Sequence, residues 1–408
     1  MHTRGPACSF IIPFQFIPMK TLLPLMLCLT ALSAAAAPYL PASGSKVIET
    51  LPGRSDPAQK EISQLRAQAL AAPGDVRIAT ALARRYIALG RSETDPRYLG
   101  YAQAALAPWW NAKAPPHAVR LLRATLLQST HHFAEAMADL DAITLADPGN
   151  AQAWLTRATV QTVQGDYEGA TRSCARLSAL ASQLASFACL GNAASASGRL
   201  AASERLLAQA LARNADAPAE EQAWVLTMLA EMATRRGDAP AAQARYRRAL
   251  ATSPRDSYLL GAYADFLLDQ KRAREAAALL GEHRRIDALL LRYALALQQQ
   301  PGSKGELAAA IKELDARFGA AMQRGDSVHQ REHARHTLHL RREARAALAL
   351  AQQNWAVQKE PADTRLVLEA ALGAGDRAAA APVLKWIEKT GLEDVAIAAL
   401  VKRLKASS

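Results

Sequence analysis

A glycine followed five residues later by a small side chain recurs along this sequence. The glycines are Gly165, Gly198, Gly237 and Gly375, and the residue five positions on is serine after Gly198 and alanine after the others. Small residues recur roughly every 34 residues, at Ala136, Ala170, Ser203, Ala242 and Ala276. Glycine ends a helix by adopting the left-handed conformation, and a small residue lets a second helix pack closely. The pattern therefore predicts stacked helical hairpins, since a simple helical bundle rarely repeats such a pair at one period.

The composition favours helices over sheets. Hydrophobic residues make up 50% of the chain and charged residues 21%, which provides a core and excludes general disorder. Aromatic residues make up only 5%, and alanine far outnumbers the β-branched residues that prefer strands. The length of 408 residues predicts two or three structural units.

Prolines at positions 148, 254 and 361 separate several of the units, because proline cannot continue a helix. Apolar residues have helical spacing between these marks. The fullest copy comprises Leu226, Leu229, Ala230, Ala233, Gly237, Ala242, Tyr246, Ala249 and Pro254. This pattern resembles the tetratricopeptide repeat (TPR), a helix–turn–helix unit of about 34 residues. The resemblance implies an all-α, right-handed α-solenoid, although Lys271 stands where one turn glycine is expected.

Six segments are expected along the chain. They are a signal peptide (1–37), a flexible tether (38–57), a degenerate N-terminal repeat region (58–115), regular TPR-like repeats (116–286), distorted helical repeats (287–360), and a C-terminal repeat with a capping helix (361–408).

The first 37 residues have the features of an export signal. We expect the true start at Met19, followed by Lys20, an apolar run over residues 22–32, and small residues at 33–37 for cleavage. The apolar run is too short to cross the roughly 30 Å of a bilayer's hydrocarbon core. The sequence therefore predicts a cleaved signal peptide and a periplasmic protein.

The chain carries a net charge of +12, and removing the signal peptide would delete only Arg4 and Lys20 among its charged residues. Such a charge favours anionic polysaccharide or a membrane surface as a contact. The basic residues are scattered and have no interleaved aromatic residues, so we expect no nucleic acid among the partners.

Two cysteines, Cys174 and Cys189, remain after the signal peptide. They lack the CxxC spacing of a redox or metal site. In an oxidising compartment they form either one structural disulfide or two buried thiols.

TPR proteins generally hold a peptide or a partner helix on the inner surface formed by the first helices. The resemblance places at this groove Gln152, Thr159, Asn192, Trp224, Thr227, Glu231, Tyr258, Asp265 and Arg365. The alternative is that these side chains simply face solvent.

Four histidines lie close together in the sequence. On one helix His329, His333 and His336 fall on one side, with His339 further round. Imidazoles one turn apart can share a metal ion. The catalytic HExxH pattern is absent, so packing is favoured over a metal site.

No nucleophile elbow, phosphate-binding glycine loop or paired catalytic carboxylates occur. We therefore expect no enzyme and no cofactor, but a periplasmic protein-interaction scaffold or adaptor whose protein or peptide partner binds in the concave groove. The alternatives are a metal-binding or metal-sensing protein, an accessory protein of envelope assembly or polysaccharide secretion, and an enzyme with a non-standard site in a deep polar pocket.

Overall fold

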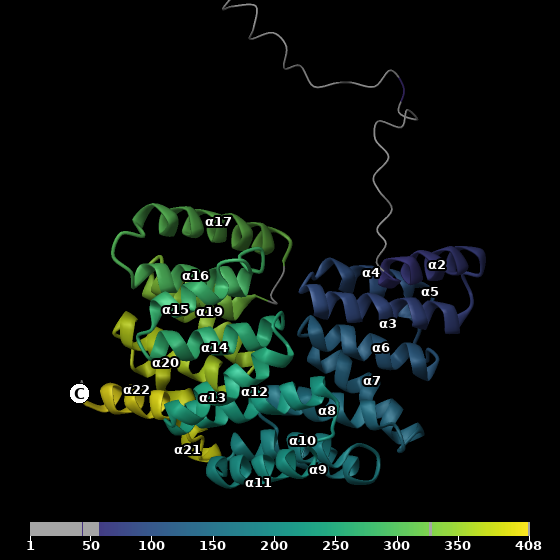
Figure 1. Cartoon of the computed structure of the whole chain (residues 1–408), viewed down its shortest axis with the longest axis horizontal. Coiled ribbons are helices and arrows are strands. Elements are labelled where there is room, and N and C mark those ends of the chain that lie inside the picture. Colours follow the sequence, from purple (N-terminus) through teal and green to yellow (C-terminus); the bar gives the residue numbers. More distant parts are fainter. Residues whose placement is uncertain (1–42, 44–56, 326–328, 407–408) are drawn as a thin grey trace, which may run out of the picture. The chain divides into compact units, whose positions relative to one another are not determined.

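The computed structural model describes residue 43 and residues 57–325 and 329–406. The predicted signal peptide, including Met19, and nearly all of the predicted tether lie outside these residues. The described residues from Pro57 onward form one compact unit (Figure 1). All its regular elements are helices, so the predicted all-α, right-handed solenoid of TPR-like repeats is confirmed for the described part of the chain.

The helices follow one another as antiparallel neighbours. The first are α2 (Pro57–Ala71), α3 (Val76–Glu93), α4 (Arg97–Ala105), α5 (Ala107–Trp110), α6 (His117–Ser129), α7 (Phe133–Ala146), α8 (Ala151–Gln164), α9 (Tyr167–Ala175), η2 (Arg176–Ala179), α10 (Gln183–Ser195) and α11 (Leu200–Arg213). The rest are α12 (Ala219–Arg236), α13 (Ala239–Thr252), α14 (Ser257–Asp269), α15 (Ala273–Leu280), α16 (Asp287–Gln298), α17 (Lys304–Gln323), α18 (Gln330–His339), α19 (Ala344–Val357), α20 (Pro361–Ala374), η3 (Ala378–Ala380), α21 (Ala381–Thr390) and α22 (Val395–Ala406).

Glycine makes the turn inside several hairpins. Gly165, Gly237 and Gly375 follow α8, α12 and α20 with φ values of 81°, 84° and 67°. In all three hairpins an aspartate comes next, and the side chains of Asp166, Asp238 and Asp376 accept hydrogen bonds from backbone N–H groups three residues on.

Three other hairpins turn in the same way without glycine, as does the pair α3 and α4, where Thr94 has a φ of 51°. His131, Lys271 and Arg342 have φ values of 62°, 60° and 60° between α6 and α7, α14 and α15, and α18 and α19. Lys271 thus adopts the left-handed conformation of the glycine that it replaces. The repeat geometry is therefore more regular than the sequence pattern.

The core runs between successive hairpins. Its largest cluster extends from Leu184 on α10 to Leu340 after α18 and includes the fully buried Tyr246 and Phe266. A second cluster joins α18–α22 to one another. Small residues at the helix contacts, such as Ala242 and Ala276, are completely buried, which allows the close helix approach that the repeat requires.

The C-terminal helices return to the middle of the solenoid and lie beside α12–α16 (Figure 1). They meet the glycine turns of three successive hairpins: Trp386 lies against Gly165, Gly391 against Gly198, and Val395 against Gly237. A Cβ atom at Gly165 would overlap the Trp386 indole. This turn therefore needs glycine both for its conformation and for the close approach.

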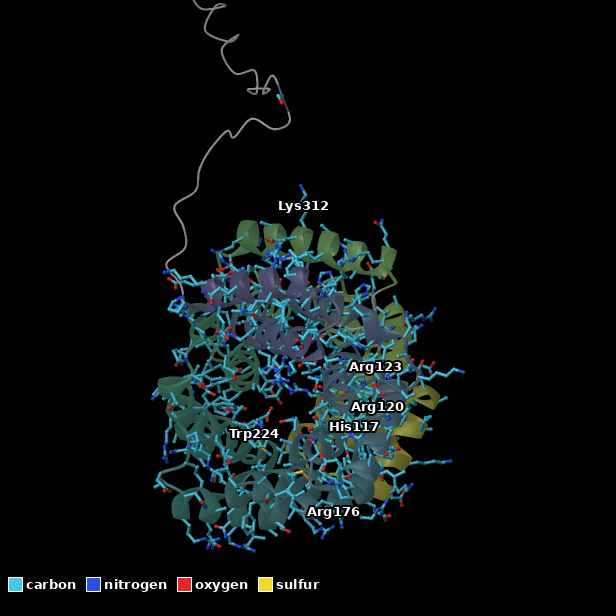
Figure 2. All side chains as sticks on the ribbon, turned by 90° about the vertical axis from the view of Figure 1, so that its right-hand side faces the viewer. His117, Arg120, Arg123, Arg176, Trp224 and Lys312 are labelled. Carbon is cyan, nitrogen blue, oxygen red and sulfur yellow. A yellow bond between two sulfur atoms is a disulfide. The ribbon has the colours of Figure 1, made fainter. Side chains whose placement is uncertain are left out.

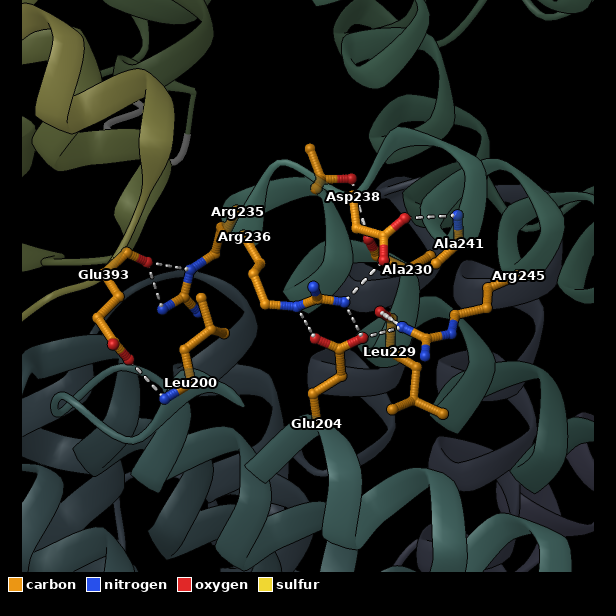
Figure 3. A network of polar contacts seen from close by, with 11 residues as sticks. Leu200, Glu204, Leu229, Ala230, Arg235, Arg236, Asp238, Ala241, Arg245 and Glu393 are labelled. Carbon is orange, nitrogen blue, oxygen red and sulfur yellow. Dashed lines mark hydrogen bonds and ion pairs between the residues drawn. The ribbon is translucent and has the colours of Figure 1, made fainter. Parts of the chain in front are cut away.

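Hydrogen bonds hold this return in place. The Lys359 backbone N–H donates to the Val163 carbonyl oxygen at 2.8 Å, and the Leu200 backbone N–H donates to Glu393 Oε2 at 2.7 Å (Figure 3). The sequence predicts a concave groove along the inner surface of the solenoid. Instead, α18, α20 and the residues before α22 lie over its inner face, because the superhelix brings the end of the chain back to its own middle.

Candidate functional site: a charged cavity on the inner face

A cavity of about 440 Å³ remains between the two parts of the solenoid. The first helices α10, α12, α14 and α16 form one wall, and α18, α20 and Asp394 form the other. The lining includes the acidic residues Glu231, Asp265, Asp269, Glu332, Glu360, Glu369 and Asp394 and the basic residues Arg235, Lys271, Arg292, Arg331, Arg335 and Arg365. The chain as a whole carries a net charge of +12. The acidic and basic side chains of the lining nearly balance, so the cavity itself is close to neutral.

Asp265 on α14 joins the walls by ion pairs. Its Oδ2 lies 2.7 Å from Arg292 Nη2, and its Oδ1 lies 2.7 Å from Arg335 Nη2 of α18. Burial would raise the pKa of Asp265, but the charges of the two arginines outweigh it, so this pKa lies well below its ordinary value. The carboxylate stays ionised and fixes α18 against α14.

Arg365 on α20 connects two carboxylates. Its Nη1 and Nη2 donate to Asp269 at 2.6 and 2.8 Å, and its Nε donates to Glu369 Oε1 at 2.7 Å. The other Glu369 oxygen lies 3.0 Å from His339 Nε2. Burial opposes ionisation of Glu369, but hydrogen bonds from His339 and Arg365 and their charges lower its pKa to about 2. The planar guanidinium suits such multidentate binding.

Arg331 anchors α18 to the start of α20. It donates to both oxygens of Asp363, at 2.5 and 2.9 Å, and also to Glu360. Asn354 of α19 donates to the same Asp363 Oδ1 at 2.6 Å. Asp363 is buried, so removing Arg331 would leave a buried carboxylate without its counterion.

Glu231 on α12 differs from the other cavity carboxylates. Among the interactions of the described residues it has no ion pair, and its hydrogen-bond partner is the Tyr258 hydroxyl, which donates to Oε1 at 2.7 Å. Burial raises the pKa of Glu231 to about 7, and the hydrogen bond opposes this only in part. The negative charge of Glu231 raises the pKa of the Tyr258 hydroxyl well above its ordinary value.

Arg235, one turn after Glu231, is held by carbonyl groups. Its Nη2 donates to the Ser195 carbonyl oxygen at 2.5 Å. The same Nη2 donates to the Glu393 carbonyl oxygen at 3.2 Å, which Figure 3 shows. Burial lowers the pKa of Arg235. Arg235 thus joins α10, α12 and the segment before α22 at the bottom of the site.

Five of the nine predicted groove residues line this cavity: Asn192, Glu231, Tyr258, Asp265 and Arg365. The other four do not. Gln152 and Thr159 are exposed on α8, and Thr227 is buried with its hydroxyl bonded to Ala223. Trp224 is 40% exposed on α12, two turns before Glu231. Figure 2 shows it on the opposite side of the view from His117, Arg120 and Arg123 of α6.

The sequence did not identify Asp269, Arg292, Arg331, Arg335 and Glu369 as site residues. The spacing of these residues could have indicated a shared face. Arg331 and Arg335 are four residues apart, and so are Arg365 and Glu369, which places each pair on one face of its helix. The sequence could not show which face points to the axis, since the C-terminal helices reach it by packing on hairpins far away in the chain.

The histidines near α18 do not converge. His336 Nε2 lies 2.7 Å from Asp315, His339 is paired with Glu369, and the His333 ring stacks on Phe318. His329 occupies the N-cap position of α18, and its side chain forms no capping hydrogen bond. In residues 57–325 and 329–406, no group of three or more His, Cys, Asp or Glu side chains is arranged to hold a metal ion.

Cys174 and Cys189 form a disulfide. It joins α9, the second helix of one hairpin, to α10, the first helix of the next. Among the described helices, none has both the length and the apolar character needed to cross a membrane.

No family model matches this chain, and no curated protein matches it. Among solved structures it is similar to a chain of the APC/C hetero-tetramer Cut9–Hcn1, with 12% identity and a TM-score of 0.49 over 85% of this chain and 66% of that one. It is also similar to the human IFIT1 dimer with m7Gppp-AAAA (13% identity, TM-score 0.42, 82% and 86% of the two chains) and to yeast Tom70 (12%, 0.33, 86% and 92%). This chain thus spans slightly less than two thirds of the first structure's chain.

Those likenesses concern the fold alone. The hairpins themselves, with their left-handed turns and small contact residues, define a TPR-like α-solenoid protein.

Proposed function

We propose that this chain is a non-catalytic scaffold or adaptor that acts in the bacterial periplasm and binds a segment of a protein partner at the rim of the charged cavity. The observation that carries the proposal is the pair of exposed aromatic residues on neighbouring first helices. Trp224 is 40% exposed on α12, one turn before the lining residue Met228, and Tyr258 of the lining is 63% exposed on α14; these two aromatic residues define the rim. Exposed Trp and Tyr side chains beside a concave site are frequent anchors of protein interfaces.

The cavity suits a short charged segment better than a large apolar one. Tyr258 presents its ring at the lining, and Glu231 beneath it lacks an ion-pair partner among the described residues. The remaining wall is held rigid by the ion pairs of Asp265 and Arg365. A preformed wall lowers the ordering cost of binding.

Two features support the periplasmic location. Residues 1–37 have the pattern of a signal peptide, and a disulfide between Cys174 and Cys189 is typical of oxidising compartments. A role in envelope assembly or polysaccharide secretion is the more specific form of this proposal.

Site-specific photocrosslinking tests the binding site. A photoreactive residue at position 224 or 258 should give a discrete adduct in cells, and the same residue at Leu145, which is 85% exposed on α7, should not. The adduct from position 258 should weaken at least about fivefold in Trp224→Ala. Equal adducts from all three positions, or none from 224 and 258, would exclude this rim as the binding site.

A second candidate function is catalysis in the cavity. The observation that favours it is Glu231, a carboxyl group with a pKa of about 7 next to a tyrosine hydroxyl, which is suited to proton transfer near neutral pH. The imidazole of His339, which also lines the cavity, is hydrogen-bonded to Glu369. A panel of hydrolase substrates tests this candidate on the wild type and on Glu231→Gln. Turnover of a substrate by the wild type that is lost in Glu231→Gln would favour an enzyme. Equal rates in both proteins would exclude Glu231 as the catalytic group.

A further inference from the structure

The second helices α11, α13 and α15 form one continuous outer surface, which we call the outer face. Glu204 of α11 accepts hydrogen bonds from Arg245 of α13 at 2.6 Å and from Arg236 at 2.8 Å (Figure 3). Arg272, just before α15, donates to Gln243 of α13 at 2.6 Å. These bonds fix the three helices side by side.

The outer face is strongly basic. Its three helices contain only two acidic residues, and both are already paired: Glu204 with Arg236 and Arg245, and Glu275 with Arg272. Five arginines on these helices are exposed and form no ion pair among the described residues: Arg205, Arg213, Arg247, Arg248 and Arg274. Excess positive charge is thus concentrated on one side of the solenoid, away from the near-neutral cavity.

The chemistry of this face fits phospholipid better than sugar. Leu206 is 49% exposed beside Arg205, and it lies on the same stripe of α11 as Arg213, seven residues on. Tyr246, the one aromatic residue of these helices, is 1% exposed, so no ring is available to stack on a sugar. Most remaining exposed positions are alanines, which let phosphate groups approach the guanidinium groups closely.

We propose that the outer face binds the surface of an anionic phospholipid membrane, with the five arginines contacting phosphate groups and Leu206 entering the headgroup region. Basic residues near such a surface each add to the attraction, and the attraction decreases with salt. This surface lies on the second helices, so it is independent of the partner site proposed for the first helices and leaves the cavity rim free.

Vesicle flotation of the full chain without residues 1–37 tests this assignment. The protein should float with vesicles of phosphatidylglycerol and phosphatidylethanolamine, but not with phosphatidylcholine alone, and 0.5 M salt should release it. Arg205→Glu/Arg247→Glu/Arg248→Glu should weaken binding at least about tenfold. Leu206→Ala should weaken it less, without changing the salt dependence.

A matched variant controls for net charge. Arg66→Glu/Arg84→Glu/Arg345→Glu changes three arginines that are likewise exposed and unpaired among the described residues, but that lie on α2, α3 and α19. Binding should stay within about twofold of the wild type. Equal loss in both triple variants, or equal flotation with both kinds of vesicle, would overturn the proposal. So would binding to polygalacturonate, a soluble anionic polysaccharide, through the same three arginines without vesicle binding. Circular dichroism melting confirms that both variants fold.

Discussion

At the scale of single residues, the turn positions show how this repeat tolerates variation. His131, Lys271 and Arg342 adopt the left-handed conformation that glycine supplies in other hairpins. That conformation costs an L-residue about 1–2 kcal/mol, because Cβ approaches the following carbonyl oxygen. Packing of the two helices of each hairpin is therefore strong enough to impose the turn on unfavourable residues.

Replacing one of these residues with glycine should stabilise the protein. Arg342 is exposed and follows α18, so Arg342→Gly should raise the free energy of unfolding by about 0.5–1 kcal/mol, after the extra entropy of glycine in the unfolded chain is subtracted. Urea denaturation measures it. Arg342→Ala is the control, because alanine has the same steric cost and should give no gain. An equal gain from both variants would show that the arginine, not the turn, is unfavourable.

Glu231 should make stability depend on pH. Its pKa is raised from 4.5 to about 7, so between these values the folded state keeps a proton that the unfolded state has released. Stability from this group is therefore lost as pH rises through that window. Glu231→Gln should be more stable than the wild type at pH 8, on the order of 2 kcal/mol, and the difference should shrink by pH 5. Urea unfolding at both pH values measures this, and a difference independent of pH would contradict it.

At the scale of the helices, the disulfide joins neighbouring hairpins. Its 15-residue separation closes a loop that runs from the end of α9 through η2 into the first half of α10. A crosslink of this length typically contributes about 2–4 kcal/mol by restricting the unfolded chain.

The expected effect can be measured with a reductant. Dithiothreitol should lower the free energy of unfolding of the wild type by about 2–4 kcal/mol, and Cys174→Ser/Cys189→Ser should show the same loss with no further response to the reductant. A wild type that does not respond to the reductant would contradict a structural role for this bond.

Many of the helical hairpins could be predicted from the sequence. The glycine at 237, the alanine at 242 and the apolar spacing between them predict one hairpin, because those signals are local. The turn at Arg342 carries no such signal, and the signal at His131 is weak, since histidine adopts the left-handed conformation more often than most residues but far less readily than glycine. Glu231, Tyr258 and Asp265 were found because they occupy inward repeat positions. Arg335 and Asp269 were not, because their roles depend on contacts across the solenoid.

At the scale of the whole molecule, the superhelix closes on itself. Residues 359–395 lie against the turns at Gly165, Gly198 and Gly237, and the Arg365–Asp269 pair joins residues 96 positions apart. This return converts an open groove into a cavity, so any partner is expected at the rim rather than along the axis.

A double-mutant cycle between Gly165 and Trp386 tests this closure most directly. Gly165→Ala should destabilise the protein by more than about 2 kcal/mol, because the new Cβ overlaps the indole of Trp386. In the Trp386→Ala background this cost should fall by more than about 1 kcal/mol. Gly302, with a φ of 89° and open space around it, is the control, and Gly302→Ala should be additive with Trp386→Ala. Additive effects for Gly165→Ala and Trp386→Ala would contradict the return of the C-terminal helices to the middle of the solenoid.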